Sequence, residues 1–191
     1  PPLIVPAVGR GEERVIAATV GAYERAAAFV MSFAPETLIV VSPHTAMYAD
    51  YFHVSPGAGA SGNFAQFGAP QEAFDAAYDA EFVRELEAAA KESGFPAGTL
   101  GERDKRLDHG VTVPLYFISR AAGKLPKIVR VGLSGLPLTE HYKFGRLIAE
   151  TAEKLGRRAA VVASGDLSHK LKADGPYGFS PDGPVYDERI M

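Results

Sequence analysis

Three of the five histidines in this chain stand where predicted elements end or begin. His44 follows an apolar run that ends at Val41, and His169 follows another that ends at Ala163. His109 comes directly before a predicted helix. Ligands of open α/β sheets bind beside the carboxyl ends of the strands. Because histidine can ligate a metal or transfer a proton near neutral pH, the three positions predict a metal or acid–base site.

Two of these histidines have a functional and a simpler interpretation. Pro43 stiffens the backbone before His44, which would fix an imidazole that suits Fe, Zn, Cu or Ni. The alternative for His44 is a hydrogen-bonded cap at the end of a strand. His109 follows Asp108, which is a good helix N-cap, and so His109 is expected at the N-terminus of a helix. The helix dipole there favours a neutral imidazole in a pocket. The alternative for His109 is a surface turn residue.

The third histidine, His169, follows Asp166 by three residues, and that carboxylate could orient the ring or hold a polar turn. The same spacing provides the base of some serine hydrolase triads. That function requires a nucleophile on a sharp turn, and the chain has no Gly-x-Ser-x-Gly motif. His53, inside a short predicted strand, and His141, in a first helical turn, are interpreted as structural or solvated.

Composition excludes several classes of protein. The 191 residues are 47% hydrophobic, carry a net charge of −3 and include no cysteine. This rules out disulfides and thiolate sites, and no basic field favours nucleic acid. No apolar run approaches the roughly 18 residues of a membrane span, and no signal peptide is visible. We expect a cytoplasmic protein without a nucleic-acid or membrane partner.

Apolar runs and helical periodicities alternate along the chain, which predicts one α/β domain over residues 1–191, with a mainly parallel central sheet flanked by helices. Strands are predicted at 3–5, 37–41, 51–55, 63–67, 127–133 and 159–163. Helices are predicted at 12–33, 79–93, 110–122 and 139–155. Loops rich in Gly, Ser, Pro and Asp are predicted at 56–62 and 171–184. The turn at residues 9–11 lacks the lysine of a P-loop and the third glycine of a dinucleotide fold.

Four motifs together resemble those of the catalytic subunits of class III extradiol ring-cleavage dioxygenases. They are Pro-Pro-Leu-Ile-Val-Pro with Gly-Arg-Gly (1–11), Ser-Pro-His (42–44), Leu-Asp-His-Gly (107–110) and Ser-Gly-Asp-Leu-Ser-His (164–169). The chain is most similar to the branch found alone or joined to an AMMECR1-type domain, the AmmeMemoRadiSam group. The resemblance extends over almost the whole chain, and the motifs are more specific to the superfamily than to a substrate.

The resemblance implies a non-haem Fe(II) held by two histidines and one glutamate, although another divalent metal remains open. His44 matches one metal-ligating histidine, His169 the catalytic acid–base and His109 a pocket histidine that hydrogen-bonds substrate or oxygen. The other two ligands are expected before Pro1 and after Met191, so truncation at both ends is expected and the chain alone should be inactive. We also expect the three histidine rings to converge on one pocket.

The resemblance implies O₂ and a catechol-type aromatic diol as the substrates. A catechol that chelates a metal must lose a proton, and a histidine with a reference pKa of about 6.5 can accept it. The alternative from another class is a Memo-like or AMMECR1-associated module for protein interaction or modification, because fold does not determine activity. An AMMECR1-type domain is a candidate partner, and self-association into a homo-oligomer is left open.

Overall fold

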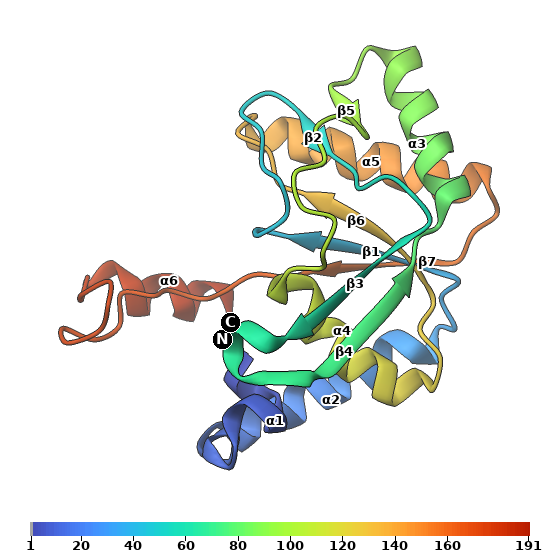
Figure 1. Ribbon diagram of the computed structural model, residues 1–191. Helices are drawn as coiled ribbons and strands as arrows, with labels where there is room; N and C mark the ends of the chain where they lie inside the picture. The colour runs from blue at the N-terminus through green and yellow to red at the C-terminus, as the bar shows by residue number, and fades with distance from the viewer. Residues whose placement is uncertain (1) are drawn as a thin grey trace.

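Three parallel strands form the centre of the fold in the computed structural model, which describes residues 2–191 (Figure 1). Strand β1 (Thr37–Ser42) lies between β6 (Lys127–Gly132) and β7 (Ala159–Ala163), and both pairings are parallel. β1 and β6 are apolar runs rich in β-branched residues and are largely buried on both faces, as in parallel sheets covered by helices. β7 is an edge strand whose residues Ala159, Val161 and Ala163 are exposed. The predicted α/β class with a parallel sheet flanked by helices is confirmed.

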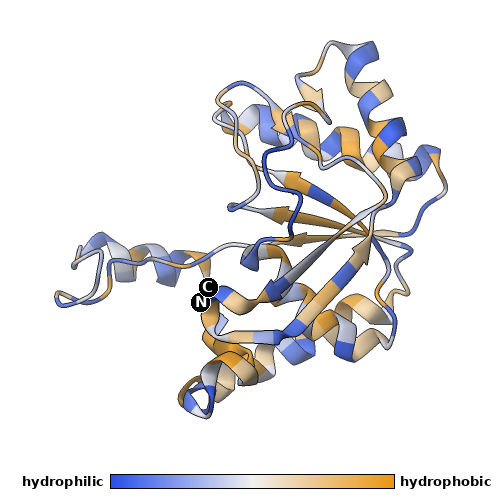
Figure 2. Cartoon of the chain, viewed as in Figure 1, coloured by the Kyte–Doolittle hydropathy of each residue, from blue (hydrophilic) through white to orange (hydrophobic). Residues whose placement is uncertain are grey.

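One face of this sheet is covered by α2 (Ala17–Ser32) and α4 (His109–Ala122). Leu38 and Val40 point to this side because successive strand residues face opposite ways, and both are fully buried. Figure 2 shows the resulting apolar character along the central strands and the helix faces beside them. This layer carries α4, and therefore the predicted site residue at its first position.

The opposite face is covered by α3 (Ala80–Ser93) and α5 (Leu138–Lys154). Ile39 and Val129 point to this side and are fully buried. The N-cap of α3 is Asp79, whose side chain accepts a hydrogen bond from the Phe82 amide. The predicted capping residue of this helix is confirmed.

The predicted strand at 3–5 is wrong. Pro2–Ile4 forms a 3₁₀ turn and α1 (Pro6–Gly9) follows it. Two prolines around this short apolar run remove backbone donors that a sheet would need, and Pro6 suits the first position of a helix. The apolar side chains still serve the core, because Ile4 and Val5 are buried. Pro1, at the start of the first motif, lies outside the described residues.

The predicted loop at 56–62 and strand at 63–67 are also partly wrong. An antiparallel hairpin joins β3 (Gly59–Phe64) and β4 (Ala69–Ala77), with a 3₁₀ turn at Ala65–Phe67 between them. Both strands are rich in Gly and Ala, which have little intrinsic preference for strands, so cross-strand pairing decides their conformation. The predicted strand at 51–55 shortens to β2 (Phe52–His53), which pairs in parallel with β5 (Ala97–Gly98).

The remaining helix predictions hold within a few residues. The predicted helix at 12–33 begins as a 3₁₀ turn at Glu12–Ile16 before α2, and the helix predicted at 139–155 is α5. The predicted loop at 171–184 is largely irregular, although α6 (Asp182–Ile190) begins inside it. Within residues 2–191, every helix is too short or too polar to cross a bilayer.

Beyond β7 the chain forms an extended arm that ends in α6 (Figure 1). Asp187 is buried and accepts a hydrogen bond from the Ser168 amide at 2.7 Å, so α6 packs back on the arm itself. Most apolar side chains of the arm are exposed, Tyr177 and Tyr186 among them. The arm therefore leaves an apolar surface in contact with solvent.

Candidate functional site

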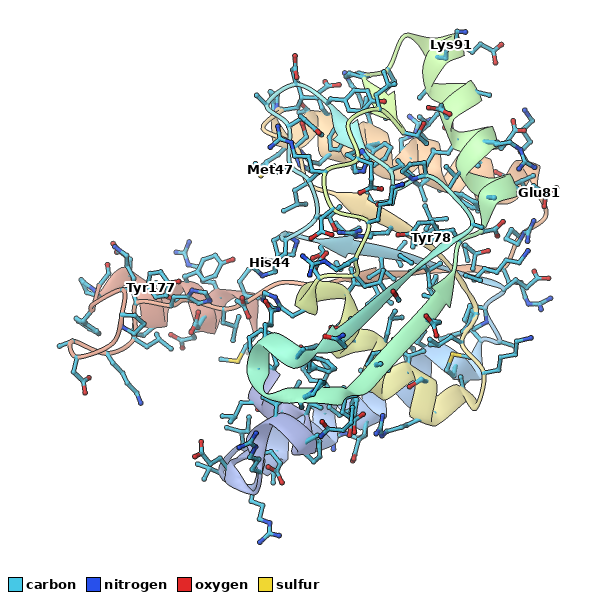
Figure 3. The ribbon with its side chains drawn as sticks, viewed as in Figure 1. His44, Met47, Tyr78, Glu81, Lys91 and Tyr177 are labelled. Atoms are coloured by element: carbon cyan, nitrogen blue, oxygen red, sulfur yellow. The ribbon has the colours of Figure 1, made fainter. Side chains whose placement is uncertain are left out.

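His44 and His109 lie against each other at the carboxyl end of β1, where Figure 3 shows His44. Their ring centroids are 4.0 Å apart and the ring planes are inclined by 39°. The backbone N–H of His44 donates to Ser42 Oγ at 3.1 Å, which fixes the turn after the strand. His109 is the first residue of α4. The fold thus brings together two of the three predicted site residues.

The carboxylate of Asp108 holds this pair of histidines in place. Its Oδ1 accepts from Ser42 Oγ at 2.6 Å and from the Val111 amide at 3.2 Å, so it also caps α4. Its Oδ2 accepts from Thr45 Oγ1 at 3.0 Å and from Arg130 Nη2 at 3.2 Å. Asp108 directly precedes His109, and it is hydrogen-bonded to Ser42 and Thr45 on either side of His44. It therefore ties the two histidine-bearing segments together.

Arg130 supports the carboxylate from inside the sheet. Its side chain is 2% exposed. Its Nε donates to Thr45 Oγ1 at 3.1 Å and its Nη1 donates to the carbonyl of Asp104 at 3.0 Å. Sequence reasoning missed this residue, although a lone arginine in an apolar strand was a usable signal. Buried charges are paired almost without exception.

Gly110 lets α4 approach β1 closely enough to place the two histidines together. A Cβ at this position would collide with Ser42 Oγ, lie 3.0 Å from Asp108 Oδ1 and lie 3.3 Å from His44 Cδ2. A side chain here would push α4 away from the turn after β1 and strain the hydrogen bonds of Asp108.

We predict that Gly110→Ala lowers the free energy of unfolding by about 1–3 kcal/mol, the usual cost of overpacking. Urea denaturation monitored by circular dichroism measures the change. Gly145→Ala is the matched control, because it lies on the exposed face of α5 and its Cβ would meet no atom within 4 Å. The control should be neutral or stabilising. An equal effect of the two substitutions would contradict the role given to Gly110.

A mostly apolar pocket of about 460 Å³ opens beside the histidine pair. It is lined by the N-terminal turn, α2, the start of α4 and the segment after β7. Its apolar walls include Ile4, Ile16, Val113 and Leu167. This size is within the range of small-ligand sites, and such walls accept a flat hydrophobic ring.

Tyr23 and Asp166 add polar groups to this pocket. Burial raises the pKa of the Tyr23 phenol, and the negative charge of Asp166 raises it further. Tyr23 is therefore a neutral hydroxyl at physiological pH, and its ring packs on Phe117 with 5.1 Å between centroids. Nothing in the sequence singled out this residue, which packs against the core together with Val20 and Ala27 of α2.

The imidazole of His109 is biased toward its neutral form. Burial lowers its pKa first and the neighbouring His44 lowers it further, while the charges of Asp108 and Asp166 oppose the shift. A neutral imidazole can accept a proton or a hydrogen bond from a bound hydroxyl. His109 lines the apolar pocket together with His44.

His169 lies apart from the other two histidines. It is absent from the lining of the apolar pocket, its side chain is 51% exposed, and its ring lies 5.0 Å from that of Tyr177 on the arm. Its Nε2 is 3.3 Å from Oδ2 of Asp166, which does line the pocket. The expected convergence of three rings is therefore found for two of them, and His169 is connected to the pocket through Asp166.

The other two histidines serve the packing of the fold. His53 is fully buried, with Nδ1 3.0 Å from the carbonyl of Leu100 and Nε2 3.5 Å from Glu102. His141 lies with its ring edge on Phe52, 4.8 Å between centroids. Both positions agree with the structural interpretation given to them above.

The donor set in the described residues is smaller than a facial triad. His44 and His109 present adjacent imidazoles, which suit iron and other transition metals. Within residues 2–191, however, no three His, Cys, Asp or Glu side chains gather where they could hold one ion. The described residues therefore do not by themselves complete an Fe(II) site, and His44 is the one expected ligand that they supply.

Over residues 1–191 the sequence matches the family described as the catalytic LigB subunit of aromatic ring-opening dioxygenase. The chain belongs to this family. Among curated proteins, it is 37% identical over 199 residues to Protein CA_C1420 of Clostridium acetobutylicum. That alignment takes in 100% of this chain and 42% of the relative, so the chain spans less than half the length of that protein.

The LigB family is described by the opening of aromatic rings by a dioxygenase. The walls of the pocket suit the ring, and the neighbouring imidazoles suit the transfer of a proton from a phenolic hydroxyl. The motifs on which the sequence resemblance is based also help to build this corner of the fold. Three of them meet at the carboxyl end of β1, in residues 42–44, 107–110 and 164–169.

Proposed function

We propose that the LigB domain belongs to a non-haem, Fe(II)-dependent extradiol dioxygenase that opens a catechol-type ring with O₂. The observation that carries this proposal is the pair of adjacent imidazoles, His44 and His109, in the wall of an apolar pocket of ring-binding size. Both oxygen atoms of O₂ enter the product of such a reaction, and the bond that breaks lies beside the two hydroxyl-bearing carbons.

Each histidine has a proposed role. His44 is an iron ligand, held in direction by Pro43 and by the hydrogen bond of its amide to Ser42. His109 hydrogen-bonds the diol or oxygen, since its lowered pKa leaves the ring neutral near pH 7. His169 is the acid–base group that exchanges a proton with the pocket, and Asp166 connects it to that space.

The pocket itself favours the binding of a protonated diol. Its apolar walls exclude water, which strengthens hydrogen bonds made inside it. Tyr23 lines the same space, and its neutral hydroxyl can donate to a hydroxyl oxygen of the diol. A base at the edge of the pocket then removes one phenolic proton and returns it to the opened product.

The test is an assay of the full natural polypeptide, reconstituted anaerobically with Fe(II), against a panel of catechols in air. Extradiol opening gives a yellow product that absorbs visible light, and one O₂ is consumed for each diol. Removal of the metal with a chelator should abolish both signals. A protein that binds iron and diols yet consumes no oxygen with any of them would refute the proposal.

We predict that His44→Ala greatly weakens iron binding by the full polypeptide, because a divalent ion that loses one of few protein ligands exchanges freely with water. Iron per protein, measured by metal analysis after gel filtration, should fall to near background. His141→Ala is the matched control, because His141 is not among the residues that line the pocket and its loss should leave the iron content unchanged. Unchanged stoichiometry and affinity in His44→Ala would exclude its role as a ligand.

A second candidate function is favoured by the C-terminal arm. Its exposed apolar side chains, Tyr177, Phe179, Tyr186 and Ile190 among them, form the kind of surface that binds another protein. A Memo-like or AMMECR1-associated module would use such a surface and need no ring-opening activity. Binding of an AMMECR1-type domain by the full polypeptide, lost in Tyr186→Asp, combined with no oxygen uptake on the diol panel, would favour this function.

A further inference from the structure

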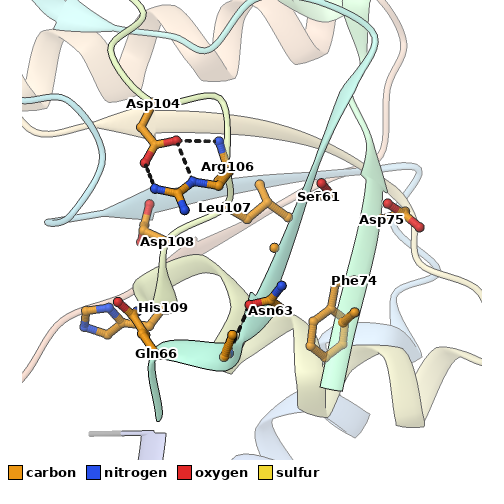
Figure 4. Close-up of a pocket in the computed structure, with 13 residues that line it drawn as sticks. Ser61, Asn63, Gln66, Phe74, Asp75, Asp104, Arg106, Leu107, Asp108 and His109 are labelled. Carbon is orange, nitrogen blue, oxygen red and sulfur yellow. Dashed lines mark hydrogen bonds and ion pairs between the residues drawn. The ribbon is translucent and has the colours of Figure 1, made fainter. Parts of the chain in front are cut away.

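His109 forms a wall shared by two cavities. On one side is the apolar pocket described above, and on the other is a second cavity of about 490 Å³. Figure 4 shows this second cavity between the β3–β4 hairpin and the segment 104–108, with His109 and Gln66 toward one end. A ligand that lies against His109 in the apolar pocket is therefore adjacent to a second space.

The second cavity has walls that are fixed by contacts. The Leu107 amide donates to the carbonyl of Ser61 at 2.8 Å, so the segment 104–108 runs along the edge of β3. Phe67, in the turn of the hairpin, meets His109 edge to face with 5.4 Å between ring centroids. Arg10 Nη2 donates to the carbonyl of Gly68 at 2.9 Å and ties the hairpin turn to the N-terminal segment.

Two neutral amide side chains, Asn63 and Gln66, line this cavity and have hydrogen-bonding groups available. Asn63 Oδ1 accepts a hydrogen bond from the Ala65 amide at 3.0 Å, which leaves its amide N–H groups as donors. The Gln66 side chain makes no hydrogen bond within residues 2–191. An amide can donate and accept. The cavity therefore offers hydrogen bonds that no group in the described structure uses.

The charges in the lining do not favour an anion. The guanidinium of Arg106 is engaged by Asp104 through two hydrogen bonds, at 3.2 and 3.0 Å. Asp108 is paired with Arg130. Asp75 also lines the cavity and has no ion-pair partner within residues 2–191. The unpaired formal charge is thus negative, and a carboxylate would meet repulsion with no free cation to offset it.

We propose that the second cavity is a subsite for an uncharged, hydrogen-bonding arm on the aromatic diol, so that the substrate is a catechol extended by an amide- or hydroxyl-bearing side chain. This inference rests on the proposed function for the ring, which occupies the apolar pocket. The arm passes His109 and meets Asn63 and Gln66. Unsubstituted catechol fills one cavity and leaves the other to water.

The experiment uses the full natural polypeptide and three diols: catechol, 3-(3,4-dihydroxyphenyl)propanamide and the matching propanoate. Binding is measured anaerobically by calorimetry, and turnover by oxygen uptake. The propanamide should bind about tenfold more tightly than the propanoate, the worth of one or two hydrogen bonds between neutral partners. The same preference should appear in KM rather than in kcat.

Two variants assign the preference to the subsite. Gln66→Ala removes one amide, and Asn63→Asp keeps the oxygen that accepts from Ala65 but replaces the donor amide with a charge. Gln66→Ala should reduce the ratio of propanamide to propanoate affinity, and both variants should reduce the ratio of propanamide to catechol affinity, by about 3- to 10-fold. Glu150→Gln, on the exposed surface of α5, is the control and should change no ratio.

The outcomes separate the two proposals. Selective binding of the propanamide without oxygen uptake supports the subsite and refutes the dioxygenase function. Ring opening with no preference among the diols, or with a preference for the propanoate, overturns the subsite and leaves the dioxygenase function standing. Preference that persists unchanged in both Gln66→Ala and Asn63→Asp, with circular dichroism showing folded proteins, also overturns it. Absence of binding by all three diols refutes both.

Discussion

Replacing Asp108 with alanine is expected to lower the free energy of unfolding by about 3–5 kcal/mol, the usual cost of breaking a buried ion pair by removing one partner. Arg130 would keep its charge at 2% exposure and lose the carboxylate that faces it at 3.2 Å. The first turn of α4 would lose its cap at Val111. Ser42 Oγ would lose its acceptor as well.

Urea denaturation of Asp108→Ala, Asp108→Asn and a double variant with Arg130→Met tests this expectation. Asparagine keeps a capping oxygen but loses the charge, so its cost should be smaller than that of alanine. The double variant should be less destabilised than the sum of the two single variants, because it leaves no unpaired buried charge. Additive costs, or a loss below about 1 kcal/mol for Asp108→Ala, would show that the pair contributes little.

The second large expected effect is a loss of turnover when His169 is replaced. His169→Ala in the iron-loaded full polypeptide should reduce kcat by about 10²–10⁴-fold, the usual contribution of a general acid–base group. The side chain touches the pocket only through Asp166, so removing it leaves the pocket walls in place. Iron content and diol binding should therefore stay near those of the natural sequence.

Asp166→Asn is the matched variant, since it keeps the shape of the residue 3.3 Å from His169 Nε2 and removes its charge. A smaller loss of kcat is expected there. If His169→Ala instead turns over normally while His109→Gln loses two or more orders of magnitude, the proton transfer belongs to His109. Stopped-flow absorbance of the diol anion and of the opened product distinguishes these results.

The central sheet and its helices were predictable because their signals are local and strong. β1 and β7 are short apolar runs bounded by turn residues, and Asp79 and Gly94 mark both ends of α3. The hairpin was harder to predict, since the strands of residues 59–64 and 69–77 are rich in Gly and Ala and become strands only by pairing with each other. At the N-terminus, the turn-forming effect of two prolines outweighed the β-branched residues between them.

Part of the candidate site was also predictable from the sequence, and part of it was not. Motifs at the end of β1 and the start of α4 correctly indicated that His44 and His109 would meet. The contributions of Arg130 and Tyr23 come from elements far away in sequence, and only the packed fold places them beside the histidines. The position of His169 depends on the direction of an extended arm, which local sequence does not determine.

The hydrogen bonds of Asp108 also bear on the order in which the molecule assembles. They join residues separated by 66 positions toward β1 and by 22 positions toward β6. Contacts between distant residues form only after the loops between them have closed, and that closure costs chain entropy. The histidine pair should therefore take shape late in folding, after β1, β6 and α4 have docked. A chain trapped short of that point would have native-like helices and a collapsed core, yet no competent pocket.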